Sequence, residues 1–387
     1  MHDEPRPGTL ASNLGDPILL TNVNLCGVTA EAKQGPGEIA VWVRMAIDSD
    51  TPHFQIIVEG LVSAIEGCLS AAGKSAQLRS ANQILLVVRS DDTAELWVDT
   101  AAQVQNITLK RSMTGGSPIF ERDIADVTGV DFPLVEIGPD DRVVCIFRVN
   151  WRFGLFFHLD TDSKLDREVM KRVLGDLYRT LRYRHLYEIT SDGDLLNKLS
   201  QAGWFPFVEI LSEFRDLAGA ARNNFDLKPA EDALLARFNK ARLDAMLARW
   251  MSKSHYADKE PLLRSAINTY LAGEPTATIK IVLTEIEGIL AAAHRAAHGT
   301  SAKTKTLIKF ALEAAAQKAG AANTLLFPAV FGRYLAEYTF ADFDPNGPLG
   351  SAGSRHAVGH GAADSASYTQ VRALQALLTL DQLSFYA

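Results

Sequence analysis

The chain has 387 residues, of which 47% are hydrophobic and 22% are charged, and its net charge is −7. This balance is typical of a folded globular protein of about two or three domains, and it excludes a wholly disordered chain. Residues 1–149 hold 11 Lys and Arg against 20 Asp and Glu. Because their overall field is negative, we expect any RNA contact in the rest of the chain.

The amino-terminal residues and the cysteines indicate a cytoplasmic protein. The first five residues include two acidic side chains and lack the basic and apolar regions of a signal peptide. No apolar run approaches the roughly 20 residues that cross a bilayer. Cys26, Cys68 and Cys145 are widely separated and have no metal-ligand spacing, which is typical of reduced thiols. We therefore expect no membrane segment.

The first part of the chain predicts an α+β domain. Residues 1–15 are rich in Pro, Gly and Asn and indicate a loose arm. Residues 16–160 are rich in strand patterns and predict a mainly antiparallel sheet, with one amphipathic helix at 54–72. The expected strands are bounded by Gly, Pro and Asp and cover 38–47, 83–89, 94–99, 106–111, 142–149 and 153–159.

From residue 164 onward, helical periodicity replaces the strand pattern. Residues 161–257 predict an all-α middle region, and residues 258–387 predict a helical bundle with short connections and one long loop at 341–353. Loops of that length in a compact bundle are usually functional or mobile. The expected helices are 164–187, 192–200, 207–222, 229–253, 259–272, 275–298, 303–319, 325–340 and 366–385.

The segment after the long loop carries the residue types of a catalytic site. Arg355 is permanently cationic and suits a phosphate group. His360 can exchange a proton near neutral pH, and His356 is a third polar group beside them. These side chains could cleave a phosphodiester without a metal. Similar Arg–His spacings occur at Arg152/His158, Arg179/His185 and Arg249/His255, so the surroundings of the segment must decide.

This segment and its helical frame resemble the HEPN superfamily of helical bundles. The resemblance covers residues from about 258 onward and depends on Arg355, the polar His356 and His360, placed before the last helix. The wording of residues 354–361 and the pair Tyr368-Thr369 also resemble bacterial HEPN-like proteins related to abortive-infection effectors. The upstream segments 150–154 and 203–207 resemble only uncharacterised bacterial proteins.

The resemblance implies a metal-independent endoribonuclease without a cofactor, whose site forms where two bundles dimerise. By position, Arg355 and His360 would be the essential pair and His356 the polar helper. The implied partners are an RNA substrate, a second copy of the chain, and a protein trigger or antitoxin. The alternative is a non-catalytic module of the same fold that dimerises and binds a partner.

The expected chemistry uses the 2′-hydroxyl of RNA, which attacks the adjacent phosphate once a base removes its proton. His360 would be this base or would protonate the leaving 5′-oxygen, and the His360 residues of two protomers would fill both roles. Arg355 would hold the phosphate and stabilise the developing charge. A structural alternative is that Arg355 caps a carbonyl or pairs with Asp364, with both histidines on a surface loop.

Two further residues are expected to support this site. Glu285 and Glu287 lie two positions apart on a helix and so face different sides. We prefer Glu287 as the inward residue that pairs with Arg355 or a catalytic histidine, because it stands beside the small Gly288. Tyr368 is a second supporting candidate at the start of the last helix. A structural salt bridge or a solvated helix face is the alternative for both glutamates.

A basic cluster with interleaved aromatic residues is a candidate RNA-binding surface. Arg179, Arg182 and Arg184 stand beside Tyr178 and Tyr183, a composition that can contact a backbone and stack bases. The alternative is an ordinary solvated helix face.

Two other motifs do not indicate a metal or nucleotide site. His294 and His298 have the i, i+4 spacing of a two-histidine metal face, but no third ligand is identifiable, and a helix-end role suits them better. The segment Gly73-Lys74-Ser75 is similar to the end of a P-loop, but Cys68 stands where the first glycine is needed.

Overall fold

The computed structural model describes residues 12–25, 27–32, 37–319, 323–342 and 349–386, and its mixture of an antiparallel sheet and many helices confirms the α+β class. The chain forms two compact units, one of residues 1–107 with 127–184 and the other of residues 108–126 with 185–387. Most of the arm expected at 1–15 lies outside the described residues.

This division differs from the predicted boundaries at 160 and 257. Helix α2 (Arg167–Arg182) was expected in the helical middle region but belongs to the first unit, because its apolar face packs against the sheet. The rest of the middle region and the carboxyl-terminal bundle form one unit. Residues 108–126, which come from the strand-rich part of the sequence, also belong to the second unit.

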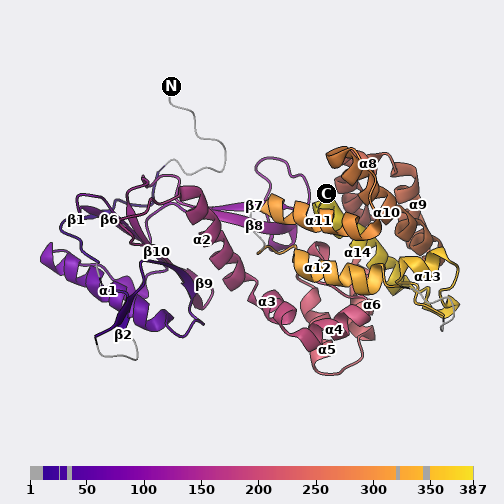
Figure 1. Cartoon of the computed structure of the whole chain (residues 1–387), viewed down its shortest axis with the longest axis horizontal. Helices are drawn as coiled ribbons and strands as arrows, with labels where there is room; N and C mark the ends of the chain where they lie inside the picture. Colours follow the sequence, from indigo (N-terminus) through magenta and orange to yellow (C-terminus); the bar gives the residue numbers. More distant parts are fainter. Residues whose placement is uncertain (1–11, 26, 33–36, 320–322, 343–348, 387) are drawn as a thin grey trace. The chain divides into compact units, whose positions relative to one another are not determined.

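The first unit is built on a six-stranded sheet in which every paired strand is antiparallel (Figure 1). Its two longest strands, β9 and β10, are joined by a two-residue turn in which Asn150 adopts a φ of 57° and Trp151 is 87% exposed. In spatial order the strands are β1 (Ile18–Leu20), β6 (Ala94–Val98), β5 (Gln83–Val88), β9 (Arg142–Val149), β10 (Arg152–His158) and β4 (Arg44–Asp48).

Both faces of this sheet are buried, each under one helix (Figure 1). Side chains alternate across a strand, so Ile84 and Leu86 of β5 pack with helix α1 (Phe54–Ala71), whereas Leu85 and Val87 pack with α2. This arrangement explains why β5 is a continuous apolar run rather than an alternating one.

Helix α1 is, among the described residues, the one helix that by length and hydropathy alone could cross a membrane. In the structure, its apolar side instead supplies core residues to the sheet, including Ile57, Leu61 and Ile65.

The second unit is a helical assembly organised around α10 (Pro275–His298) and α14 (Gln370–Tyr386). Nearly every residue of α14 from Ala373 to Ser384 is buried, which identifies it as the central helix. The other helices of the unit are α3 (Arg184–Ser191), α4 (Gly193–Gln201), α5 (Phe214–Arg222), α6 (Lys228–Arg237), α7 (Lys240–Met251), α8 (Ser254–Ala257), α9 (Glu260–Leu271), α11 (Thr304–Ala319), α12 (Pro328–Tyr334) and α13 (Arg355–Gly359).

The segment Gly203–Phe207 is a buried break between helices, as the proline predicted. Trp204, Phe205 and Phe207 are fully buried, and the rings of Phe205 and Phe207 pack against Phe331. This aromatic cluster forms part of the core beneath α14, where Phe331 also contacts the ring of Tyr386.

Several predicted elements are divided or displaced. The strand expected at 38–47 is two strands, β3 (Ile39–Val41) and β4, and the helix expected at 325–340 is α12 followed by the π-helical turn η4 (Leu335–Thr339). The strand expected at 106–111 is β7 (Val104–Leu109). Its partner β8 (Ile124–Asp131) and the short strands β1 and β2 (Ala30–Ala32) were not predicted.

Candidate functional site

The Arg355–His360 segment consists of the short helix α13 (Arg355–Gly359) and His360 at its carboxyl end. Ser354 begins α13, because its hydroxyl accepts a hydrogen bond from the Ala357 amide at 3.4 Å. The same hydroxyl donates to the Ala341 carbonyl at 3.1 Å, which fixes the helix start to the end of the preceding helical segment. Residues 343–348 of the long loop expected at 341–353 lie outside the described residues.

Arg355 forms an ion pair with Glu287 of α10, which is the pairing that we expected, but the side chain of Glu285 is the more buried of the two glutamates, at 13% against 25% exposed. The second carboxylate oxygen of Glu287 accepts a hydrogen bond from the Thr304 hydroxyl at 2.6 Å. Glu285 faces elsewhere and pairs with Lys259 at 2.9 Å. The alternative pairing of Arg355 with Asp364 is wrong, since Asp364 instead caps the next turn through the Ala366 amide.

His356 is oriented by the Ala341 carbonyl, which also accepts the hydrogen bond from the Ser354 hydroxyl. Its Nδ1 lies 3.1 Å from the Ala341 oxygen, and a ring nitrogen facing a carbonyl must carry a proton. In a neutral His356, Nε2 is therefore the nitrogen that can accept a proton or a hydrogen bond. The position of the ring is thus fixed while one nitrogen keeps its basic character.

The three predicted catalytic side chains line one cavity of about 350 Å³. Arg355, His356 and His360 contribute to its wall with Leu283 and Thr284 of α10. Arg355 and His356 are partly buried and His360 is exposed, so the cavity has a fixed base and an accessible edge. The cavity therefore brings together an arginine and two imidazoles, as the sequence predicted.

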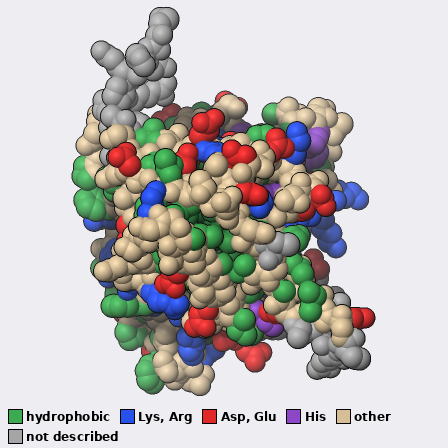
Figure 2. Space-filling model, turned by 90° about the vertical axis from the view of Figure 1, so that its left-hand side faces the viewer, with side chains coloured by type: hydrophobic (Ala, Val, Ile, Leu, Met, Phe, Trp, Pro, Cys, Tyr) green, Lys and Arg blue, Asp and Glu red, His purple; other side chains and the backbone are tan. Residues whose placement is uncertain are grey.

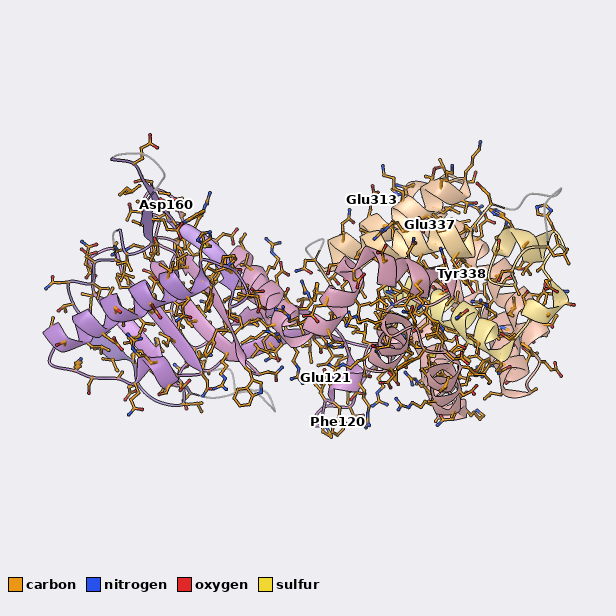
Figure 3. All side chains as sticks on the ribbon, turned by 90° about the horizontal axis from the view of Figure 1, so that it is seen from below. Phe120, Glu121, Asp160, Glu313, Glu337 and Tyr338 are labelled. Carbon is orange, nitrogen blue, oxygen red and sulfur yellow. The ribbon has the colours of Figure 1, made fainter. Side chains whose placement is uncertain are left out.

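Tyr368 does not line this cavity. Its ring lies 6.0 Å from the ammonium of Lys280, and partial burial raises the pKa of its hydroxyl. The tyrosine that does support the Arg/His segment is Tyr338, which sequence reasoning missed (Figure 3). A Cβ added at Gly353 would lie 2.3 Å from the Tyr338 ring, so glycine is required where this ring packs beneath the segment.

Tyr338 is itself held by polar side chains of α14. Its hydroxyl donates to Gln375 at 2.9 Å and accepts from Arg372, whose guanidinium lies 5.4 Å from the ring centroid. Burial raises the pKa of Tyr338 to about 12, although Arg372 opposes this shift. The sequence signal for this packing is Gly353, which stands two residues before Arg355.

The three arginines of the predicted RNA-binding cluster all interact with other groups of the protein. Arg179 is 1% exposed and donates to the Val127 carbonyl and to Asp176, so its predicted RNA contact is wrong. Arg182 is half-buried and donates to Asn150 at 3.3 Å, and Arg184 pairs with Asp50. Figure 2, which does not label these three residues, shows a face on which basic and acidic side chains are interspersed.

His294 and His298 pack as aromatic groups at the end of α10. Their ring centroids are 4.6 Å apart, and both rings contact Phe310 edge-on. His294 also places Nδ1 3.0 Å from the Thr300 carbonyl, beyond the helix end at Gly299. Within the described ranges no group of three or more His, Cys, Asp or Glu side chains could hold a metal ion.

A scan of protein-family models and searches of curated proteins and of solved structures find no match to this chain.

Proposed function

We propose that this protein is a metal-independent endoribonuclease of the HEPN type that acts in bacterial defence or stress response. The single observation that carries the proposal is the cavity in which Arg355, His356 and His360 converge. Arg355 supplies a phosphate ligand, and the His360 imidazoles of two copies supply the general base and the general acid. The RNA substrate, cytoplasmic action and assembly as a homodimer through the helical unit belong to the same proposal.

The reaction follows from the chemistry of these groups. His360 removes the proton of the 2′-hydroxyl, and the 2′-oxygen forms a bond to the adjacent phosphorus. The bond from phosphorus to the 5′-oxygen breaks, and a second imidazole protonates that oxygen. The products are a 2′,3′-cyclic phosphate and a 5′-hydroxyl. The second imidazole is His360 of a partner copy, with His356 placed to orient the phosphate.

The test is cleavage of RNA by the purified protein in EDTA. Arg355→Ala and His360→Ala are each expected to lower the cleavage rate by about 100-fold or more. Arg264→Ala and His298→Ala are matched controls in the same unit, because Arg264 pairs with Glu260 on an exposed helix face and His298 packs against Phe310. Equal activity in all variants, or loss of activity in EDTA, would refute the proposal.

The Glu287 ion pair gives a second, graded test. Glu287→Gln keeps the size of the side chain but removes the charge that positions Arg355. We expect cleavage to fall by about 10- to 100-fold, because a displaced guanidinium holds the phosphate in a poorer geometry. Glu285→Gln, which affects only the Lys259 pair, is expected to retain full activity. A Glu287→Gln enzyme as active as Glu285→Gln would show that the pair is not part of catalysis.

A second candidate function is a non-catalytic module that dimerises and binds a partner. The favouring observation is that Arg355 is neutralised by Glu287 and that His356 holds the Ala341 carbonyl, so both also stabilise local structure. Induced expression in bacteria distinguishes the two functions. Growth arrest with RNA breakage in the wild type but not in His360→Ala supports the ribonuclease, whereas an unchanged phenotype supports the module.

A further inference from the structure

The second unit contains another charged cavity, of about 290 Å³, whose lining residues differ from those of the Arg355 cavity. One wall comes from the segment between β7 and β8, which contributes Lys110 and Arg122. Phe120 and Glu121, labelled in Figure 3, directly precede Arg122 in this segment. The opposite wall comes from Glu209 and from helix α7, which contributes Arg242.

The carboxylates that line this cavity are all paired with arginines. Glu209 accepts from Arg242 at 2.9 Å and from Arg249 at 3.0 Å. Glu213 accepts from the same Arg242 at 2.9 Å. On the opposite wall, Asp123 pairs with Arg111 at 2.7 Å. The negative charges of the cavity are therefore already neutralised by its own side chains.

Among the described residues, the two cationic side chains Lys110 and Arg122 of this cavity form no ion pair with a carboxylate. Lys110 is only 6% exposed, and within the part of the chain that the structure describes its ammonium has no hydrogen-bond or ion-pair partner. Arg122 lies with its guanidinium 4.8 Å from the Phe120 ring centroid, and among the described residues it has no acidic partner. A buried ammonium without a direct hydrogen-bond or ion-pair partner is costly, so an anion bound in the cavity would offset this cost.

We propose that this cavity binds a small phosphorylated ligand, with Lys110 as the central contact and Arg122 closing over it. Five cationic side chains against three carboxylates leave an excess of positive charge for a polyanion. The cavity volume of about 290 Å³ is larger than a single halide ion would fill. Lysine and arginine together are the side chains that most often hold phosphate groups in proteins.

The electrostatics of Lys110 agree with this assignment. Burial lowers the pKa of its ammonium, and the nearby Arg242 and Arg249 lower it further, whereas Glu209 and Glu213 raise it. Since the folded-state pKa lies below that of the unfolded chain, protonated Lys110 destabilises the fold at neutral pH. A bound phosphate would offset this cost and stabilise the folded protein.

The test is calorimetric titration of the full chain with pyrophosphate. We expect binding in the wild type and a loss of about tenfold or more in affinity in Lys110→Met and in Arg122→Gln. Lys240→Met is the control, because Lys240 lies on α7 but is exposed and pairs with Asp244 at 2.6 Å. Absence of pyrophosphate binding, or unchanged binding in Lys110→Met, would overturn the proposal.

Two further measurements separate the ligand classes and the role of Lys110. If citrate binds as tightly as pyrophosphate, the assignment of the ligand as a phosphate is wrong. The assignment is also wrong if single-stranded RNA binds in a Lys110-dependent way while pyrophosphate does not bind. In the absence of ligand, Lys110→Met is expected to melt at a higher temperature than the wild type. A lower melting temperature would mean that Lys110 is only a structural residue. None of these outcomes depends on ribonuclease activity.

Discussion

Replacement of Asp381 by alanine is expected to lower the free energy of unfolding of the helical unit by about 3–5 kcal/mol. Asp381 is 1% exposed on α14 and accepts hydrogen bonds from Arg249 at 2.6 Å and from the Trp250 indole at 2.8 Å. Alanine would remove one carboxylate partner from the buried Arg249 guanidinium and the acceptor from the buried Trp250 indole N–H. Urea unfolding followed by far-ultraviolet circular dichroism measures the change.

The asparagine variant at the same position separates charge from hydrogen bonding. Asp381→Asn keeps an acceptor for Trp250 but removes the charge. Burial raises the pKa of Asp381 against the opposing effect of Arg249, so the folded state binds this proton more tightly than the unfolded chain does. The contribution of Asp381 to stability therefore falls as the pH rises from the unfolded value toward the folded one, and Asp381→Asn removes this dependence.

Asparagine is thus expected to cost less than alanine. The exposed Asp244→Ala, which breaks only a surface pair with Lys240, should change stability by less than about 1 kcal/mol. A loss in Asp381→Ala no larger than that in Asp244→Ala would contradict the assignment of this buried cluster to the stability of α14.

Substitution of Gly203 by alanine is expected to cost about 2–4 kcal/mol, the sum of backbone strain and overpacking. Gly203 has a φ of 85°, and an added Cβ would lie 2.3 Å from Arg372 and from Gln375, and 2.4 Å from the Tyr338 hydroxyl. Arg372 and Gln375 hold the Tyr338 hydroxyl, and the Tyr338 ring packs against Gly353 just before α13. The same substitution is therefore expected to reduce both the unfolding midpoint and the proposed RNA cleavage.

Gly273 provides the matched control. Its φ of 74° imposes a similar strain, but nothing lies within 4 Å of an added Cβ. Gly273→Ala is expected to cost only about 1 kcal/mol, the strain alone. If both variants lose the same stability in urea unfolding, the crowding around Gly203 is not significant.

Local signals in the sequence predicted the bounds of α1, α10 and α11 to within about one residue, whereas the helices expected at 164–187, 207–222 and 229–253 are each divided in two. Helix α10 spans 275–298 as predicted, because Pro275 can begin a helix and Gly299, with a φ of 72°, can end one. The pairing of Glu287 with Arg355 was expected because Gly288 is small enough for another helix to approach, but Gly288 is exposed and only Glu285 lies within 4 Å of an added Cβ. The pairing is therefore as expected, whereas the reason given for it is wrong.

The failures come from contacts between distant parts of the chain. Arg179 has the sequence surroundings of a solvated helix face, but its partner is the Val127 carbonyl, 52 residues away. The Lys110 cavity forms only because the segment after β7 meets helix α7, more than a hundred residues later. Contacts between residues that are far apart in the chain leave no periodicity or motif in the sequence, so secondary-structure propensities cannot predict them.

The division of the chain has a consequence for how this protein can be taken apart. The backbone passes between the two units at 107–108, at 126–127 and again at 184–185, so cleavage of one peptide bond leaves them covalently joined. A fragment that begins at residue 185 would lack Asp126, whose carboxylate receives the Leu325 amide at 3.2 Å and the Thr324 hydroxyl. The helical unit therefore cannot be transplanted as a contiguous module, and a functional fragment must carry residues 108–126 with it.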